Sequence, residues 1–156
     1  MKRQALQFLM AVCLVGATLF LGMLWVKKYE SSPDAKARYE VQAVRLKRDK
    51  GYVWLEAHLK KSGDQDHDLK QEVRLVTANG VKHEPADSTF AGSPETGFTE
   101  IWFKFWLDKE ELKGDISLKM NGGTLKIKSS QPAPVVRADK ETVFKSSDWQ
   151  PSWLGF

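Results

Sequence analysis

Residues 98–107 read FTEIWFKFWL, and this stretch decides the fold that the sequence predicts. Apolar side chains recur at every second position, which is the period of a strand with one buried face. These side chains are Ile101, Phe103, Phe105 and Leu107. The opposite face of the same strand carries Trp102, Lys104 and Trp106. We therefore expect a long strand with an aliphatic and aromatic inner face and a second, partly polar face.

Residues 52–60, YVWLEAHLK, repeat this pattern. One face would carry Val53, Leu55, Ala57 and Leu59, and the other Tyr52, Trp54, Glu56 and His58. Such alternation is typical of a half-buried strand. Two strands of this kind predict a sandwich whose core lies between two sheets.

Shorter strand-like segments extend the pattern along the chain. They are residues 39–48, 71–77, 81–83, 116–120 and 125–127. Asn79 and Gly80 between two of these predict a type I′ hairpin turn, whereas residues 85–97 are rich in Pro and Gly and predict a crossing loop. Asp108 followed by Glu111 predicts a capped single helical turn. The fold class expected is therefore all-β, an antiparallel β-sandwich of about seven strands.

The expected core is a set of six apolar residues on the inner faces of these strands. It consists of Leu55, Val73, Ile101, Phe103, Phe105 and Leu118. The domain contains no cysteine, so disulfides do not contribute to its stability.

The chain resembles the membrane-anchored immunoglobulin-like domains of bacterial exported proteins over residues 39–129. The resemblance is carried by GYVWLEAHLKKSG, by the Asn-Gly hairpin and by FTEIWFKFWLDKEELKG. It implies an extracytoplasmic binding or accessory module with an immunoglobulin-like strand arrangement. No functional residue follows from it, and the Cys–Trp–Cys core of antibody-type domains is absent.

The amino-terminal region predicts a membrane anchor. Residues 5–26 contain no charged side chain and lie between Lys2 and Arg3 on one side and Lys27 and Lys28 on the other. Twenty-two helical residues span about 33 Å, which suffices for a hydrocarbon core of about 30 Å. A cleaved signal peptide is the alternative, although no small-x-small site ends the apolar run.

The expected organisation places a transmembrane signal-anchor at residues 1–28 and a linker at 29–38. The sandwich follows at 39–130 and an aromatic tail at 131–156. We expect the amino terminus in the cytoplasm, membrane lipid around residues 5–26 and the remainder outside. Of the 24 basic residues, four flank the anchor, which leaves 20 against 20 acidic residues in the rest of the chain. This balance argues against nucleic acid as a partner.

No pattern in the sequence predicts catalysis, a cofactor or a metal. The three histidines, His58, His67 and His83, lie in separate elements, and we expect them to face solvent. Asp64, Asp66 and Asp68 alternate as in a calcium loop, but Leu69 and Leu75 stand where an EF-hand has its Gly and Glu. A solvated acidic loop is the expectation.

The candidate partner-binding residues are aromatic. They are Tyr52, Trp54, Trp102 and Trp106 on the non-core face, and Trp149, Trp153 and Phe156 in the tail. The tail is expected to fold back over this face, since so large an aromatic surface is seldom left exposed. Alternatively the tail stays free to dock a partner, because aromatic anchors dominate interface energetics.

These features predict a scaffold or accessory subunit that binds a cell-envelope protein. The alternative is a cell-wall or carbohydrate-binding module that uses the exposed aromatic rings as stacking platforms. An enzyme is not expected.

Overall fold

The computed structural model describes residues 15–16, 34–129, 136 and 141–145. The chain divides into two units, Met1–Ser32 and Pro33–Phe156. In the first unit only residues 15–16 are described, and they are helical. The predicted anchor at residues 5–26 thus falls almost wholly outside the described residues. Within the described part of the chain, no helix is long and apolar enough to cross a membrane.

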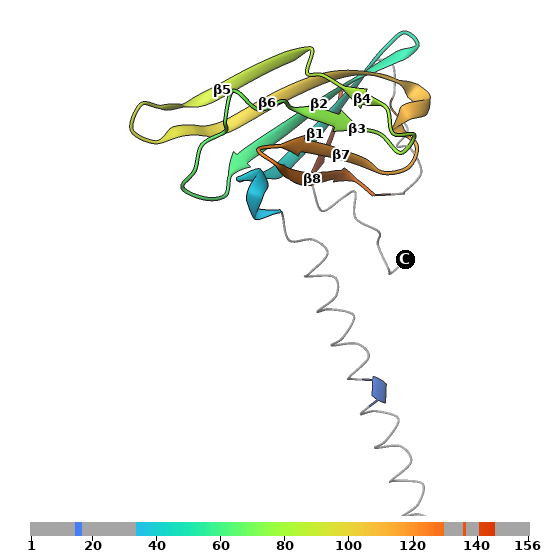
Figure 1. Ribbon diagram of the computed structural model, residues 1–156. Coiled ribbons are helices and arrows are strands. Elements are labelled where there is room, and N and C mark those ends of the chain that lie inside the picture. The colour runs from blue at the N-terminus through green and yellow to red at the C-terminus, as the bar shows by residue number, and fades with distance from the viewer. Residues whose placement is uncertain (1–14, 17–33, 130–135, 137–140, 146–156) are drawn as a thin grey trace, which may run out of the picture. The chain divides into compact units, whose positions relative to one another are not determined.

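The second unit is a sandwich of two antiparallel sheets (Figure 1). The five-stranded sheet has the order β5 (Asp87–Ser93), β6 (Gly97–Asp108), β2 (Tyr52–Lys61), β1 (Tyr39–Asp49) and β9 (Thr142–Lys145). The four-stranded sheet has the order β4 (Lys82–His83), β3 (Arg74–Val76), β7 (Ile116–Met120) and β8 (Gly123–Lys128). Two short 3₁₀ helices, η1 (Ala35–Ala37) and η2 (Lys109–Leu112), complete the described elements. The expectation of an all-β antiparallel sandwich is confirmed.

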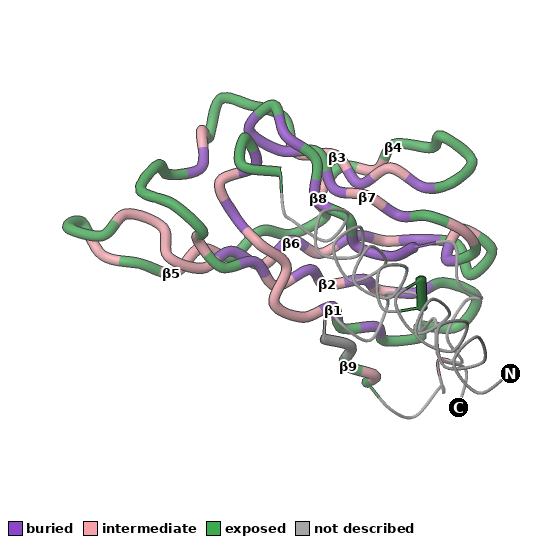
Figure 2. The backbone as a smooth tube through the Cα atoms, turned by 90° about the horizontal axis from the view of Figure 1, so that it is seen from below, coloured by how far each residue is buried: buried purple, intermediate pink, exposed green. Residues whose placement is uncertain are grey.

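The core lies between the sheets, where the two long alternating strands place their apolar residues (Figure 2). In β2 and β6 every predicted inward position is at most 1% exposed. Leu55 lies opposite Phe105, and Ala57 lies opposite Phe103. Of the six residues predicted to form the core, five are buried, whereas Val73 is only partly buried against the cluster. Val73 precedes β3, so its backbone is not held in the sheet.

Two described strands were not predicted as such. β5 occupies most of the segment predicted as a crossing loop, and β9 lies inside the predicted tail. β5 has only one large apolar residue, Phe90, so its sequence lacks a clear alternation. Its conformation comes from antiparallel pairing with β6 along the whole strand. β9 pairs with β1 from Ala43 to Leu46.

The predicted Asn79–Gly80 turn is present but its type is different. Gly80 has φ +78°, whereas Asn79 does not have a positive φ. Gly80 donates its N–H to the Thr77 carbonyl, and Thr77 donates to the carbonyl of Val81. This pattern is a three-residue loop with Gly in the left-handed position, so the type I′ prediction is wrong. The predicted cap of η2 is confirmed, since Asp108 N–H donates to the Glu111 carboxylate over 2.8 Å.

The last residues of the predicted linker belong to the packed domain. Asp34 caps η1 by accepting from Lys36 N–H, and its second oxygen accepts from Thr124 N–H in β8. Ala37 is fully buried. A Cβ at Gly123 would overlap the backbone of Ala37, so only glycine permits this approach of β8 to η1. The entry of the chain is thus attached to the four-stranded sheet before β1 begins in the other.

Candidate functional site

The candidate site is the outer face of the five-stranded sheet, which is the face turned away from the four-stranded sheet. All four aromatic residues predicted on the non-core face lie here. Trp54 lies opposite Trp106 in the register of β2 and β6, and Tyr52 is 45% exposed. The three tryptophans on this face are partly buried.

Contacts among the aromatic rings explain this partial burial. The Trp54 and Trp106 rings meet edge to face with centroids 4.3 Å apart, and Tyr52 lies 5.1 Å from Trp106. Farther along the same strands, the His58 ring stacks on Trp102 at 4.6 Å. Such pairs cover one another, which reduces the exposed aromatic surface.

A row of charged residues crosses the sheet between the two aromatic groups. Its members alternate in sign from strand to strand in the order Asp87, Lys104, Glu56, Arg45 and Glu141. Neighbouring members lie 3.6–3.9 Å apart. We call this row the charge ladder. Opposite charges face each other in register across the β5–β6, β6–β2 and β2–β1 pairs, so the ladder is compatible with the sheet.

A pocket of about 440 Å³ opens along the charge ladder. It is lined by Arg45, Lys47, Trp54, Glu56, Asp87, Lys104 and Glu141. Three of these side chains are basic and three are acidic, and the indole of Trp54 forms the aromatic wall. Lys47 has no ion pair with any described residue.

The Glu56 carboxylate is the least exposed member of the ladder, at 18%. Arg45 Nε lies 3.7 Å from one oxygen and Lys104 Nζ lies 3.6 Å from the other. Both distances exceed the hydrogen-bond range of about 2.7–3.2 Å for N–H···O. Among the described residues none donates a hydrogen bond to Glu56, so its oxygens can accept hydrogen bonds from a ligand that enters the pocket.

The remaining predicted site residues, Trp149, Trp153 and Phe156, lie outside the described residues, so the docked and free arrangements of the tail stay predictions. The structure describes Val136 and residues 141–145 of the tail: Val136 packs against the core cluster, and β9 extends the five-stranded sheet at its edge. Val143 there is 54% exposed, and the neighbouring Glu141 lines the pocket.

Most pocket residues were not predicted from the sequence. Arg45, Asp87 and Glu141 come from three strands or their margins, and only the pairing register brings them together. The available signal was the repeated placement of charges at outward positions, such as Glu56 and Lys104. Pairing those positions correctly requires the sheet order.

The environments of the three histidines also differ from the expectation that all of them face solvent. His58 and His83 are partly buried and bonded to Glu100 and Glu111 at 2.8 and 2.9 Å. His67 was predicted to face solvent, and this is wrong, because it is only 6% exposed. Its ring lies among Phe90 and Phe103 with centroids about 6 Å away.

His67 belongs to a buried polar cluster that joins three parts of the chain. Asn121 donates from Nδ2 to the Ala37 carbonyl at 2.8 Å, which fixes the orientation of its amide. Its Oδ1 accepts from Asp68 N–H at 2.9 Å and lies 2.8 Å from His67 Nδ1. Because Oδ1 can only accept, Nδ1 carries the proton and donates.

Tyr39 connects this cluster to the start of β6. Its hydroxyl donates to the Phe98 carbonyl at 2.7 Å and accepts from His67 N–H at 3.4 Å. Burial raises the pKa of the Tyr39 phenol, and the nearby Asp66 carboxylate acts in the same direction. The hydroxyl is thus held in its neutral, donating form.

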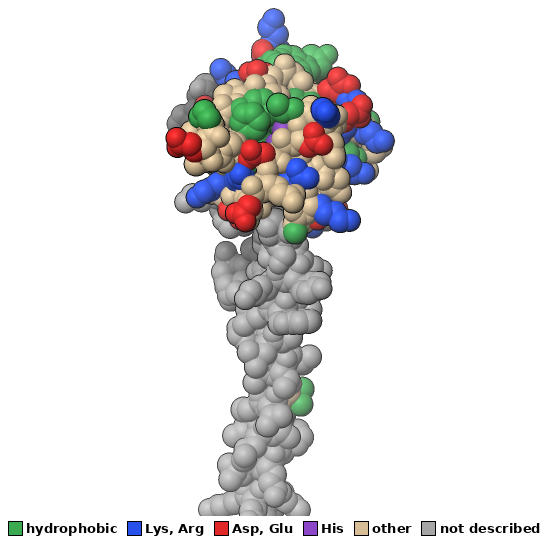
Figure 3. Space-filling view, turned by 60° about the vertical axis from the view of Figure 1, so that its left-hand side comes forward, with side chains coloured by type: hydrophobic (Ala, Val, Ile, Leu, Met, Phe, Trp, Pro, Cys, Tyr) green, Lys and Arg blue, Asp and Glu red, His purple; other side chains and the backbone are tan. Residues whose placement is uncertain are grey.

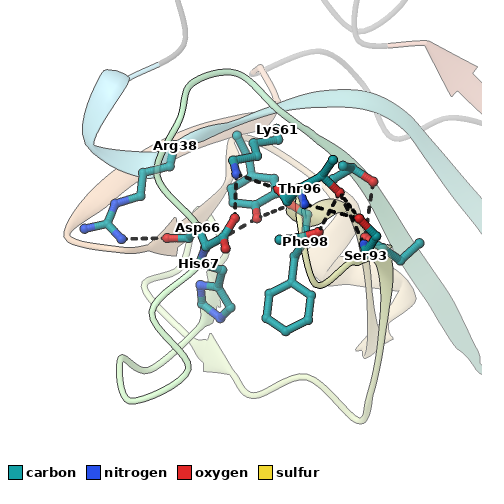
Figure 4. Close-up of polar contacts among 11 residues, drawn as sticks. Arg38, Lys61, Asp66, His67, Ser93, Thr96 and Phe98 are labelled. Carbon is teal, nitrogen blue, oxygen red and sulfur yellow. Dashed lines mark hydrogen bonds and ion pairs between the residues drawn. The ribbon is translucent and has the colours of Figure 1, made fainter.

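The neighbouring Asp66 connects the loop between β2 and β3 to Arg38 and Lys61 (Figure 4). Its carboxylate accepts from Lys61 Nζ at 2.6 Å, and its carbonyl accepts from Arg38 at 2.6 Å. Lys61 also donates to the Thr96 carbonyl in the β5–β6 turn. Figure 3 shows the adjoining end of the domain, where acidic and basic side chains intermingle and a hydrophobic patch lies beside a histidine.

The aspartates of the predicted acidic loop do not converge. Asp66 is bonded to Lys61, whereas Asp68 accepts from the Lys70 N–H at 3.0 Å. Within the described ranges, no group of three or more His, Cys, Asp and Glu side chains is placed to hold a metal ion.

A scan against protein-family models finds no match, and neither does a search of curated proteins or of solved structures.

Proposed function

We propose that the chain is a single-pass membrane-anchored, extracytoplasmic interaction module with an immunoglobulin-like fold, which binds a protein of the cell envelope through its outer face. The apolar stretch at residues 5–26 and its basic flanks support the anchor. The amino terminus lies in the cytoplasm, and the sandwich lies outside.

The strand order supports the immunoglobulin-like assignment. One sheet contains the sequence β1–β2–β6–β5, and the other β4–β3–β7–β8. Lettered in chain order, with β4 as C′, these are ABED and C′CFG, the arrangement of constant-type domains with one added strand. β9 then adds a strand outside A.

The observation that carries the binding function is the composition of the outer face. The partly buried Trp54 lines a pocket that also contains Arg and Lys, and aromatic residues and Arg are the side chains that dominate interface energetics. The hydrophobic core is formed by residues on the inner side of the sheet, so the side chains of the outer face are not required for its packing.

Site-specific photo-cross-linking in intact cells tests this proposal. A photoreactive amino acid in place of Lys47, inside the pocket, is expected to capture one envelope protein. The control is the same amino acid in place of Lys119, which is exposed on the four-stranded sheet. The adduct should disappear when Trp54→Ala is added. Equal labelling from both positions, or persistence in the Trp54 variant, would contradict the proposal.

A saccharide of the cell wall is the second candidate, and the pocket itself favours it. Sugar hydroxyls donate and accept, so a row that alternates carboxylates with cations beside an indole can bind them. Co-sedimentation with purified peptidoglycan separates the candidates. Retention that Glu56→Gln and Trp54→Ala both abolish would favour the saccharide, whereas no retention together with a Lys47 adduct would favour the protein partner.

A further inference from the structure

The four edge strands of the sandwich differ in how far they can accept another strand. An unpaired edge offers free backbone N–H and C=O groups, and folded proteins usually protect such edges by shortness, charge or coverage. β4 has two residues and β9 has four. β8 carries the exposed side chains of Thr124 and Lys126, and η1 packs against it.

β5 lacks this protection along most of its length. It has seven residues, DSTFAGS, with no lysine, arginine or proline. Its single charge, Asp87, is paired with Lys104 of β6 at 3.7 Å. β6 is paired with one edge of β5, and no described strand pairs with the other. One irregularity, between Ala91 and Gly92, interrupts the pairing near its end.

We propose that β5 is an interaction surface for a second copy of this chain, with two β5 strands pairing antiparallel about a two-fold axis at Phe90. This register places Thr89 opposite Ala91 of the other copy and Ser88 opposite Gly92. Asp87 then faces Ser93. Every charge therefore meets a small neutral residue, and no like charges oppose each other.

Phe90 provides the apolar contact in this register. Its ring is only partly buried, where it packs against Phe98 and lies beside His67. The two-fold axis brings the two Phe90 side chains directly opposite each other on the inner side of the joined sheets. Directly opposed aromatic pairs stabilise antiparallel strands. An isologous contact of this kind closes at two copies.

The first test measures the mass of the full-length protein in detergent by analytical ultracentrifugation over a hundredfold concentration range. The wild-type chain is expected to shift from monomer to dimer. Ala91→Lys places a charge on the β5 edge and should weaken the dimer at least tenfold. The matched control is Val143→Lys on the opposite edge of the same sheet, which should leave the dimer unchanged. A monomer throughout, or equal weakening by both variants, overturns the proposal.

The second test determines the register by disulfide cross-linking in a Cys13→Ala background. Phe90→Cys should cross-link to itself, because directly opposed Cα atoms lie within the 4.4–6.8 Å that a disulfide allows. Ser88→Cys should not, since four residues of extended strand, about 13 Å, would separate the two thiols. Efficient cross-linking of the Ser88 variant alone would overturn this register. Loss of the dimer on deletion of residues 146–156, without a cross-link at position 90, would assign the edge to a neighbouring tail and also overturn it.

Discussion

The polar groups of this domain form two systems that differ in geometry. Around Asn121, hydrogen bonds of 2.8–2.9 Å join buried partners from η1, the β2–β3 loop and the β7–β8 turn. In the charge ladder, ion pairs of 3.6–3.9 Å join side chains that, apart from the less exposed Glu56, are about half accessible to water. The polar groups of the Asn121 cluster are bonded to one another, whereas the Glu56 carboxylate of the charge ladder can still accept hydrogen bonds.

This difference separates a structural cluster from a candidate binding site. A buried polar group that loses its partner costs about 1–3 kcal/mol, whereas an exposed ion pair contributes about 0–1 kcal/mol. The Asn121 cluster should therefore determine stability and the charge ladder should not. A ligand has access only to the second system.

The largest effect is expected for Asn121→Ala. The substitution leaves the Ala37 carbonyl, the Asp68 N–H and the His67 ring N–H without their partner. We expect a loss of about 3–5 kcal/mol in the free energy of unfolding, from several groups at about 1–3 kcal/mol each. Urea unfolding followed by tryptophan fluorescence measures it. A loss below about 1 kcal/mol would show that water replaces the cluster.

Asn121 also has φ +52°, so part of this loss could come from the backbone. Asn121→Gly is the control, because glycine adopts positive φ without a steric penalty. If the side-chain hydrogen bonds account for the loss, the Gly variant should be nearly as unstable as the Ala variant. A Gly variant close to wild type would assign the effect to the backbone.

Gly97→Ala is expected to rank second. Gly97 has φ +66°, and a Cβ there would overlap the Asp66 carboxylate that binds Lys61. Gly80→Ala is the matched control, since Gly80 has φ +78° with open space around it. The control should lose about 1–2 kcal/mol from backbone strain. The Gly97 variant should lose clearly more, and equal losses would mean that Asp66 moves aside without cost.

Tyr39→Phe removes one hydroxyl from the buried system and should cost about 1–2 kcal/mol at pH 7. The variant should also change the pH dependence of stability. Because burial raises the pKa of Tyr39 in the folded state, the wild type keeps this contribution below pH 10 and loses it as the pH rises through the raised pKa. The Phe variant lacks this alkaline loss. Parallel stability curves between pH 9 and 11 would contradict the assignment.

The smallest effect on stability is expected in the charge ladder. Glu56→Gln keeps the shape of the side chain and should change the free energy of unfolding by less than about 1 kcal/mol. Glu72→Gln, which removes one of the two exposed carboxylate partners of Arg74, is the control for general loss of charge. Only the Glu56 variant should impair binding at the pocket. A strongly destabilised Glu56 variant would show that the charge ladder, like the Asn121 cluster, determines the stability of the domain.

The sequence predicts one part of this comparison well. Alternation in residues 52–60 and 98–107 suffices for the sandwich, its core and the aromatic outer face, because burial on one side of a strand leaves a period of two. β5 could not be predicted from the sequence, because it consists mostly of small or polar residues without a clear alternation and is stabilised by its pairing with β6. A strand of this kind is stabilised by its neighbour.

The two polar systems were harder to predict for different reasons. Asn121 precedes two glycines and is typical of a turn, and nothing local indicates that its amide bonds with His67, 54 residues earlier. The ladder depends on the strand order that brings Asp87 of β5, Glu56 of β2 and Glu141 beside β9 into one row. Both arise from contacts between distant segments, which a single sequence does not encode as a local pattern.

The attachment of η1 also determines how the domain responds to mechanical tension. Asp34 and Ala37 are bonded to β8 and Asn121 in one sheet, and two residues later the chain enters β1 in the other. A pulling force applied at Asp34 would therefore act on both sheets before it acts on the β1–β2 strand pair alone. Tension applied through Asp34 would load hydrogen bonds to both sheets at once, so this end of the domain is expected to resist being peeled from the sandwich.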